Sequence, residues 1–412
     1  MQRIYLLTFF VQTLLIQAQA WPSENWSAAT NLTAVMDGNG VTDLSGLHFN
    51  VVNNRLYAVQ NDGHLRVLQR NSANNTFSQI AYKTLSGGPE GITQANLNAN
   101  EFYTIDENNY EIRRYTHTAN FSTVSLYKHW NLLALPSPMQ DTGNNGCEGI
   151  VFIADSYLTA VGFISEQTGQ AYTSVKGLGG LFFVASQDGG YIWVFDVNPN
   201  VNDDFAYVGK YKTNRAESCE LSFDNSTGLL YILHDIAGNN KLEVTNLSTF
   251  ITGGGNRKFI TLNEFLLTNP GDANENIEGF AMTPKCSATE TTSAWLCRDV
   301  ENNEAVAIQQ DVLRWFNPFD APGTCAPLET LGFEQDNLVV VSPNPATTQI
   351  AISVRNMRNV TMQICNSLGQ CVLKNMISNG TLMLDISSLS KGIYILKVND
   401  DERTATIKWI KN

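Results

Sequence analysis

The sequence has little continuous apolar character outside its first twenty residues. Only residues 4–16 form a long apolar run, and it is shorter than the roughly 20 residues that cross a bilayer. Arg3 precedes this run, and Ala18-Gln19-Ala20 follows it with small residues where a signal peptidase reads the chain. We therefore expect residues 1–20 to be a cleaved signal peptide rather than a membrane anchor, with Trp21 as the first mature residue.

Basic residues are also scarce. The chain of 412 residues has 26 Lys and Arg against 39 Asp and Glu, which gives a net charge of −13. Binding to a phosphate backbone needs clustered Lys and Arg, so a nucleic-acid partner is not expected. An acidic balance is compatible with calcium or a cationic ligand.

Several catalytic and metal-binding motifs are missing. The sequence contains no nucleophile elbow, Walker loop or Rossmann fingerprint. Its seven Cys form no CxxC pair, so zinc is not expected. In an exported chain these residues can form disulfides, and Cys286–Cys297 and Cys365–Cys371 are two candidate pairs. The alternative is that several are buried apolar thiols.

Helical windows rich in Ala or Leu are rare as well. Asn, Gly, Ser and Thr are instead plentiful between short apolar runs, which is typical of an all-β protein. The length fits two domains.

One short motif recurs through the middle of the chain. Its copies are Ser45-Gly46-Leu47, Pro89-Glu90-Gly91, Cys147-Glu148-Gly149, Cys219-Glu220-Leu221 and Ile277-Glu278-Gly279. In three copies a Tyr follows at a nearly constant distance, and each copy reads as two short strands joined by a polar turn. The spacing of the copies fits four-stranded blades better than a tight solenoid.

We therefore predict that residues 21–325 form a five- or six-bladed β-propeller. A sixth blade could be closed by strands from both ends of the domain, near Leu32–Met36 and Ala305–Trp315. A plain β-sandwich is the alternative.

The motifs of residues 40–315 resemble those of the SdiA-regulated protein family and are similar to those of phytase-like or esterase-like propellers. This resemblance implies a calcium-binding, six-bladed propeller. The chain departs from the family pattern at Cys219-Glu220-Leu221, and it lacks the aspartate-rich run of a β-propeller phytase.

The segment 337–412 has motifs of its own. They are Ser342-Pro343-Asn344-Pro345, the run Asp385–Tyr394 and the alternating end Thr406–Lys411. This ordered set resembles the type A sorting domain of type IX secretion substrates of Bacteroidetes, a small Ig-like β-sandwich. The resemblance implies recognition by the type IX machinery and a secreted or cell-surface location. A generic Ig-like adhesive module is the alternative, and residues 326–336 would be the linker.

The propeller pattern also predicts a metal site. Glu90, Glu148, Glu220 and Glu278 occupy equivalent places in four blades and should converge on the axis. Carboxylates that lie so close raise one another's pKa unless a cation compensates. Calcium takes six to eight oxygen ligands, so we predict a calcium site there. The alternative is that these residues cap turns by accepting backbone N–H bonds.

Antiparallel pairing should bring the end of each second strand beside the start of the first. This places His234 and Arg298 on the same face as the glutamates. The same reasoning applies to Gln60, Asp62, Asp106, Glu107, Asp235 and Asp299. His234 would be a candidate base and Arg298 an anion contact in a metal-assisted hydrolysis. The alternative is structural pairing with Asp235 and Asp299.

Two functions follow from these predictions. The first is a secreted, calcium-assisted esterase or phosphoesterase. The second is a non-catalytic binding or adhesion propeller at the cell surface, in which calcium only locks the blades. In both cases we expect a monomer without a transmembrane segment.

Overall fold

The computed structural model describes residues 18–36, 41–143, 145–235, 240–272, 274–287, 291–325, 339–354, 360–366, 371–377, 380–399 and 404–412. The chain divides into two compact units, Met1–Cys325 and Ala326–Asn412. Most regular structure is β-strand, which confirms the predicted all-β class. The predicted linker and most of the predicted signal peptide lie outside the described residues. Within these residues, no helix has the length and apolar character to span a membrane.

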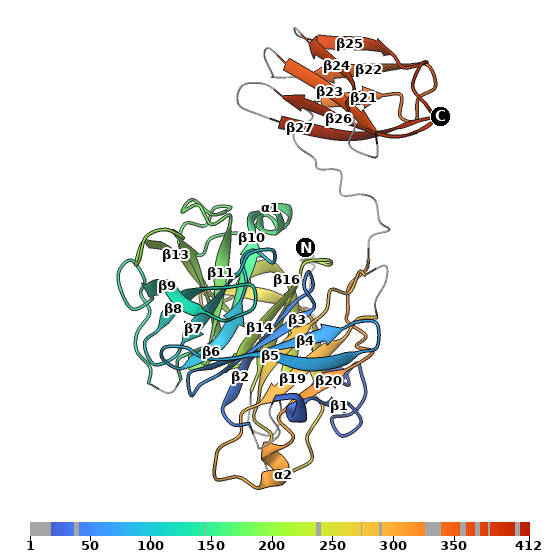
Figure 1. Cartoon of the computed structure of the whole chain (residues 1–412). Coiled ribbons are helices and arrows are strands. Elements are labelled where there is room, and N and C mark those ends of the chain that lie inside the picture. The colour runs from blue at the N-terminus through green and yellow to red at the C-terminus, as the bar shows by residue number, and fades with distance from the viewer. Residues whose placement is uncertain are drawn as a thin grey trace, which may run out of the picture. The chain divides into compact units, whose positions relative to one another are not determined.

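The first unit is built from four-stranded antiparallel groups that follow one another along the chain (Figure 1). The first group contains β2 (Leu44–Asn50), β3 (Arg55–Gln60), β4 (His64–Asn71) and β5 (Thr76–Thr84). The second contains β6 (Pro89–Thr93), β7 (Glu101–Asp106), β8 (Glu111–His117) and β9 (Val124–Asn131). The third contains β10 (Cys147–Ala154), β11 (Gly180–Ser186), β12 (Tyr191–Val197) and β13 (Phe205–Lys212).

Two further groups complete this unit. The fourth contains β14 (Glu220–Asp224), β15 (Leu229–His234), β16 (Lys241–Ile251) and β17 (Arg257–Leu266). The fifth contains β18 (Ile277–Met282), β19 (Ala294–Arg298), β20 (Leu313–Phe316) and, from the start of the unit, β1 (Thr30–Asn31). A single parallel pair, Lys212 with Lys258, joins the third and fourth groups into one eight-stranded sheet. Short helices are α1 (Asp155–Val161), α2 (Val306–Gln309), η1 (Thr33–Met36) and η2 (Asp188–Gly190).

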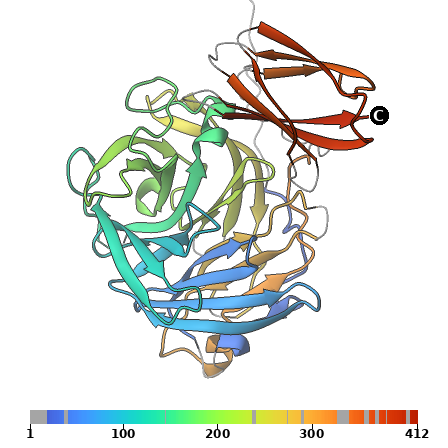
Figure 2. The same ribbon diagram turned by 45° about the horizontal axis from the view of Figure 1, so that its top comes forward.

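The first strands of these groups form a closed ring. Strand β2 packs against β6 and β18, β6 against β10, β10 against β14, and β14 against β18. Figure 2 shows the groups following one another around a common centre, from blue to orange. The two ends of the unit do meet, because β1 pairs with β20 (Thr30 opposite Trp315). These ends complete the fifth group and do not form the additional sheet that the expected sixth blade would need. Residues 33–36 and 306–309, where its strands were expected, are short helices.

The recurring tyrosine explains part of the repeat. Tyr57, Tyr103 and Tyr231 are fully buried. Each packs against a phenylalanine of the next group, with ring centroids 6.3 Å apart for Tyr57–Phe102, 4.8 Å for Tyr103–Phe182 and 5.7 Å for Tyr231–Phe280. The tyrosine therefore fills the interface between neighbouring groups, which fixes its distance from the motif.

Neither candidate disulfide pair is formed, although Cys286 does take part in a disulfide. Cys286 bonds to Cys325, whereas Cys297 is a buried thiol beside the carbonyl groups of Leu44 and Ser45. Cys365 and Cys371 face each other across two strands, but both are free thiols. Sequence spacing could not identify Cys325, because it lies at the far end of the unit and returns to the loop before β19.

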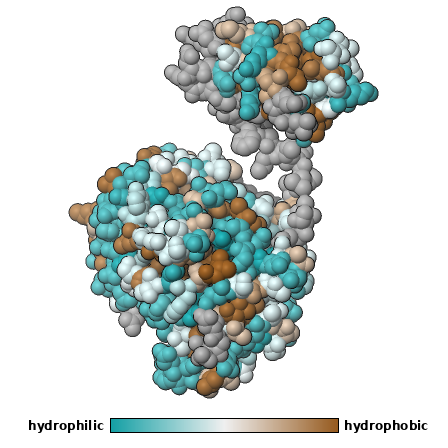
Figure 3. All heavy atoms as spheres, in the orientation of Figure 1, coloured by the Kyte–Doolittle hydropathy of each residue, from teal (hydrophilic) through white to brown (hydrophobic). Residues whose placement is uncertain are grey.

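The second unit has two antiparallel sheets around one core. The first sheet contains β21 (Val339–Ser342), β22 (Gln349–Val354) and β25 (Gly380–Asp385); the second contains β23 (Val360–Asn366), β24 (Cys371–Ile377), β26 (Gly392–Asn399) and β27 (Thr404–Lys411). Trp409 is fully buried and stacks on Tyr394 at 5.1 Å. In the view of Figure 3 the surface of the first unit is mainly hydrophilic with scattered apolar patches, whereas the second unit shows a broader apolar patch between hydrophilic ones.

Candidate functional site: an acidic cluster on the ring axis

The motif glycines let the first strands approach closely at the centre of the ring. A Cβ on Gly91 would lie 2.6 Å from the backbone nitrogen of Ile150, and one on Gly149 would lie 2.6 Å from the Cα of Glu220. Any larger residue would collide with the backbone of the next strand. The repeated Gly is therefore required by strand packing.

The strand pairing is irregular at the same positions. Register shifts occur at Leu44/Leu47, Pro89/Gly91, Cys147/Ile150 and Ile277/Gly279. A bulge bends the strand and redirects the side chain beside it. In the fourth group, where Leu221 stands in place of the Gly, pairing runs regularly from Glu220 to Asp224. The departure of this copy from the sequence motif thus has a structural counterpart.

Five acidic side chains gather where these first strands begin. We call Glu90, Glu107, Glu148, Glu278 and Asp299 the axial acidic cluster. Pro89 pairs with Asp106, and Ile277 pairs with Arg298, so the residues that follow, Glu107 and Asp299, lie beside the motif glutamates. The charges of Glu90 and Glu278 raise the pKa of Glu148, and the charge of Glu90 raises the pKa of Glu278. These effects agree with the predicted convergence of the three side chains.

Burial and mutual repulsion both keep protons on this cluster. Burial, followed by the charges of Glu107 and Asp299, raises the pKa of Glu90 to about 8. Burial also raises the pKa of Glu148 well above its usual range, as do Glu90 and Glu278. Burial, followed by Asp299 and Glu90, does the same to the pKa of Glu278. The cluster therefore holds protons at neutral pH that ordinary carboxyls would lose.

The hydrogen bonds of the cluster leave oxygen atoms available. Glu107 and Glu148 share a hydrogen bond, which requires a proton on one of the two carboxyls. Ser45 hydrogen-bonds to Glu90, yet the Oε1 atom of Glu90 is buried with no hydrogen-bond partner among the described residues. The amide of Asn276 donates to Oε1 of Glu278 at 2.9 Å. Motif reasoning missed Ser45 and Asn276, although Asn276 lies two residues before Glu278 on the chain.

Glu220 has a different environment from the other motif glutamates. Its Oε2 accepts the N–H of Leu47 at 2.9 Å, its Oε1 accepts the N–H of Leu221 at 2.8 Å, and the N–H of Ile150 also donates to it. Burial raises its pKa, and these N–H groups lower it. Glu220 thus joins the first, third and fourth groups through backbone bonds. This matches the turn-capping alternative better than a ligand role.

We expect Glu220→Gln to destabilise the first unit by about 1–3 kcal/mol with or without calcium. The amide keeps one acceptor oxygen but turns an N–H₂ toward backbone donors, which leaves a buried donor unpaired. Thermal unfolding of the full chain measures this loss. The matched control is Glu90→Gln, which breaks no backbone bond and should not destabilise in EDTA at pH 8. Equal destabilisation by both variants would contradict the bridging role.

Several other residues predicted for this face are held in local pairs. Asp106 binds Arg113 at 2.6 Å, and Asp62 contacts the Nδ1 atom of His64 at 2.7 Å. Gln60 donates to the carbonyl of Thr42 at 2.7 Å and accepts from Arg66. Burial, followed by the charge of Glu217, raises the pKa of Asp235 to about 6.

His234 and Arg298 are both fully buried in structural pairs. The Nε2 atom of His234 contacts Glu243 at 3.0 Å, and its Nδ1 atom contacts the carbonyl of Glu217. Arg298 binds Asp272 at 2.7 Å and the carbonyl of Asp311 at 2.8 Å. The alternative of structural pairing therefore fits these contacts, although the partners differ from the expected Asp235 and Asp299. The catalytic roles of His234 and Arg298 stay predictions.

Within the described ranges, no three His, Cys, Asp or Glu side chains are placed so that they could hold a metal ion. Glu90, Glu148 and Glu278 nevertheless supply the carboxylate oxygens that calcium prefers, including the unpartnered Oε1 of Glu90. The oxygen atoms of Glu220 are committed to backbone N–H groups, so it does not fit this ligand set.

Comparisons with known proteins identify the second unit. Residues 340–412 match the family model of the secretion system C-terminal sorting domain. This confirms the predicted sorting domain and implies recognition by the type IX secretion system and export out of the cell. No curated protein sequence matches the chain.

Two solved structures are similar to the chain at low levels. One is PorZ of Porphyromonas gingivalis, described as an essential bacterial surface component of the type IX secretion system. It has 11% identity and a TM-score of 0.27, with 90% of this chain and 45% of PorZ covered. The other is Raptor of Chaetomium thermophilum, with 10% identity, a TM-score of 0.34, and 95% and 29% coverage. The chain thus spans less than half the length of either structure.

Proposed function

We propose that this protein is an exported five-bladed β-propeller that binds calcium at its axial acidic cluster and acts as a binding module. The ring of first strands and the pairing of β1 with β20 support five blades, since the ends of the unit complete the fifth group. The sorting domain supplies the route out of the cell. Removal of residues 1–20 as a signal peptide would leave Trp21, whose ring packs against Phe316 and Phe319.

The unpartnered Oε1 atom of Glu90 carries the calcium proposal. It is buried among carboxyls whose largest electrostatic influences are other acids. A divalent cation would replace the protons that these groups hold and would remove their repulsion. Glu90, Glu148 and Glu278 would supply the charged ligands.

Without calcium, we expect the melting temperature of the first unit to fall by about 5 °C as the pH rises from 5 to 8. The folded-state pKa of Glu90, about 8, lies above its ordinary value of 4.5. The stability that this raised pKa contributes is therefore fully present below pH 4.5 and is lost as the pH rises through 8. Calcium competes with protons, so the shift in melting temperature that it causes should grow over the same range.

The variant Glu90→Gln tests both parts of this prediction. It should raise the melting temperature in EDTA at pH 8, flatten the pH dependence and reduce the calcium shift. Asp320→Asn, an exposed acid of the same unit, is the control and should behave like the wild type. A wild-type chain that keeps the pH dependence but shows no calcium shift at pH 8 would rule out the cation site.

The hydrolase alternative has one observation in its favour. The carboxyls of Glu107 and Glu148 share a proton, as pairs that perform acid–base chemistry do. A screen of the purified chain against phosphate monoesters, carboxylic esters and lactones, with calcium and with EDTA, distinguishes this activity from binding. Calcium-dependent turnover that is lost in Glu148→Gln would establish the enzyme.

A further inference from the structure

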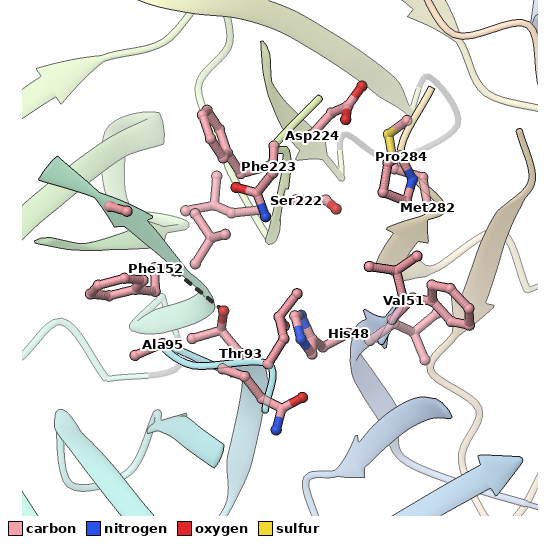
Figure 4. Close-up of a pocket in the computed structure, with 18 of the residues that line it drawn as sticks. His48, Val51, Thr93, Ala95, Phe152, Ser222, Phe223, Asp224, Met282 and Pro284 are labelled. Carbon is pink, nitrogen blue, oxygen red and sulfur yellow. Dashed lines mark hydrogen bonds between the residues drawn. The ribbon is translucent and has the colours of Figure 1, made fainter. Parts of the chain in front are cut away.

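A cavity lies on the ring axis at the other ends of the first strands. Glu90 stands at the start of β6 and Thr93 at its end, so this cavity is about 10 Å from the acidic cluster along the strand. Its volume is about 270 Å³, and every group of the ring contributes to its lining. Figure 4 shows His48, Thr93, Phe152, Ser222 and Met282 arranged around it.

The lining offers apolar and aromatic surface but no available charge. Asp224 is the only residue carrying a formal charge among the described lining residues. Its carboxylate accepts hydrogen bonds from Ser226, from Thr227 and from the N–H of Lys285. A charged ligand would therefore be buried without a partner, which costs several kcal/mol.

His48 supplies a polar atom that lacks a partner. Burial lowers the pKa of its imidazole to about 4, so the ring is neutral at physiological pH. The side chain of Gln94 hydrogen-bonds to the imidazole, whereas its Nε2 atom is buried with no hydrogen-bond partner in the described part of the chain. In Figure 4 the imidazole lies among the labelled lining side chains, which include Phe152 and Phe223. Leaving such an atom without a hydrogen bond costs free energy, which a bound molecule that forms this bond would recover.

We propose that this cavity binds a small neutral molecule with one aromatic ring and one polar group that bonds to Nε2 of His48. The volume of about 270 Å³ lies near the lower end of the range of small-molecule sites, about 300–1,000 Å³, which suits a single substituted ring. Aromatic and aliphatic walls favour an aromatic body over a sugar, because a sugar carries several hydroxyls that would each need a partner. This site is independent of the calcium proposal.

The test uses three probes that share one ring and differ in charge: benzyl alcohol, benzoate and benzylamine. Titration of the full chain, followed by ligand-observed NMR at pH 7, should give at least tenfold tighter binding of benzyl alcohol than of either charged probe. Ser222→Trp should abolish this binding, because the indole fills the cavity. Ser78→Trp, which places the same side chain on the exposed face of β5, should leave it unchanged.

His48→Phe provides a second, milder variant. It removes the polar atom and keeps the ring, so the preference for benzyl alcohol should fall at least fivefold while the melting temperature is kept. Equal binding of the charged probes, no binding of any probe at millimolar concentration, or unchanged binding in His48→Phe would overturn the proposal. If Ser222→Trp does not fold, His48→Phe decides the outcome.

Discussion

A chain that ends at Cys325 is expected to fold in the periplasm and to disappear from the cell surface and the medium. The truncation keeps the Cys286–Cys325 disulfide and removes only the second unit, whose buried core consists of its own residues. The first unit therefore loses no core packing, while the sorting domain that the type IX machinery recognises is gone. Expression in a bacterium with this secretion system, followed by fractionation, measures the result.

Two controls make this result specific. The melting temperature of the truncated chain should match that of the first unit in the full chain, which excludes misfolding as the cause of retention. Residues 326–412 fused to an unrelated periplasmic reporter should carry that reporter out of the cell. Efficient release of the truncated chain would contradict a sorting role for the second unit.

Gly91→Ala should cost the first unit about 3 kcal/mol or more, which corresponds to roughly 5 °C in melting temperature. The new Cβ would lie 2.6 Å from the nitrogen of Ile150, 2.8 Å from the carbonyl oxygen of Glu148 and 2.8 Å from the Cα of Gly149. All three are backbone atoms of the neighbouring first strand, so no side-chain rotation relieves the collision. Thermal unfolding by circular dichroism measures the loss.

Gly253→Ala is the matched control for this substitution. A Cβ at Gly253 meets no atom within 4 Å, so the same chemical change should leave the stability within about 0.5 kcal/mol of the wild type. If Gly91→Ala changed the stability as little as Gly253→Ala, the conclusion that the close approach of the strands requires the motif glycines would be wrong.

The sequence predicted the repeat architecture because one packing problem recurs in each group. Four copies bring a strand to the axis with a Gly at the close approach, and three copies fill the interface with the next group with a Tyr. Gly91 and Tyr103 are examples of these two requirements within one copy. The convergence of Glu90, Glu148 and Glu278 follows from the same repetition.

The details that escaped prediction depend on contacts between copies. Glu220 resembles the other glutamates in sequence, but the regular pairing beside Leu221 turns its carboxylate toward backbone N–H groups of two other strands. His234 contacts Glu243 on the adjacent strand rather than Asp235, its neighbour in sequence. The cavity around His48 has no sequence signal, because its lining comes from the strand ends of every group.

The pairing of β1 with β20 has a consequence for how the protein folds. The hydroxyl of Thr33 accepts a bond from the N–H of Val312, 279 residues later, so the last sheet cannot be completed until nearly the whole unit is available. Contacts of such long range make folding slow. Until that final step the edge of β20 is unpaired, and an unpaired strand edge invites aggregation. A circular permutant that begins between two groups and joins the present ends would make this step local, so it should fold faster into the same ring.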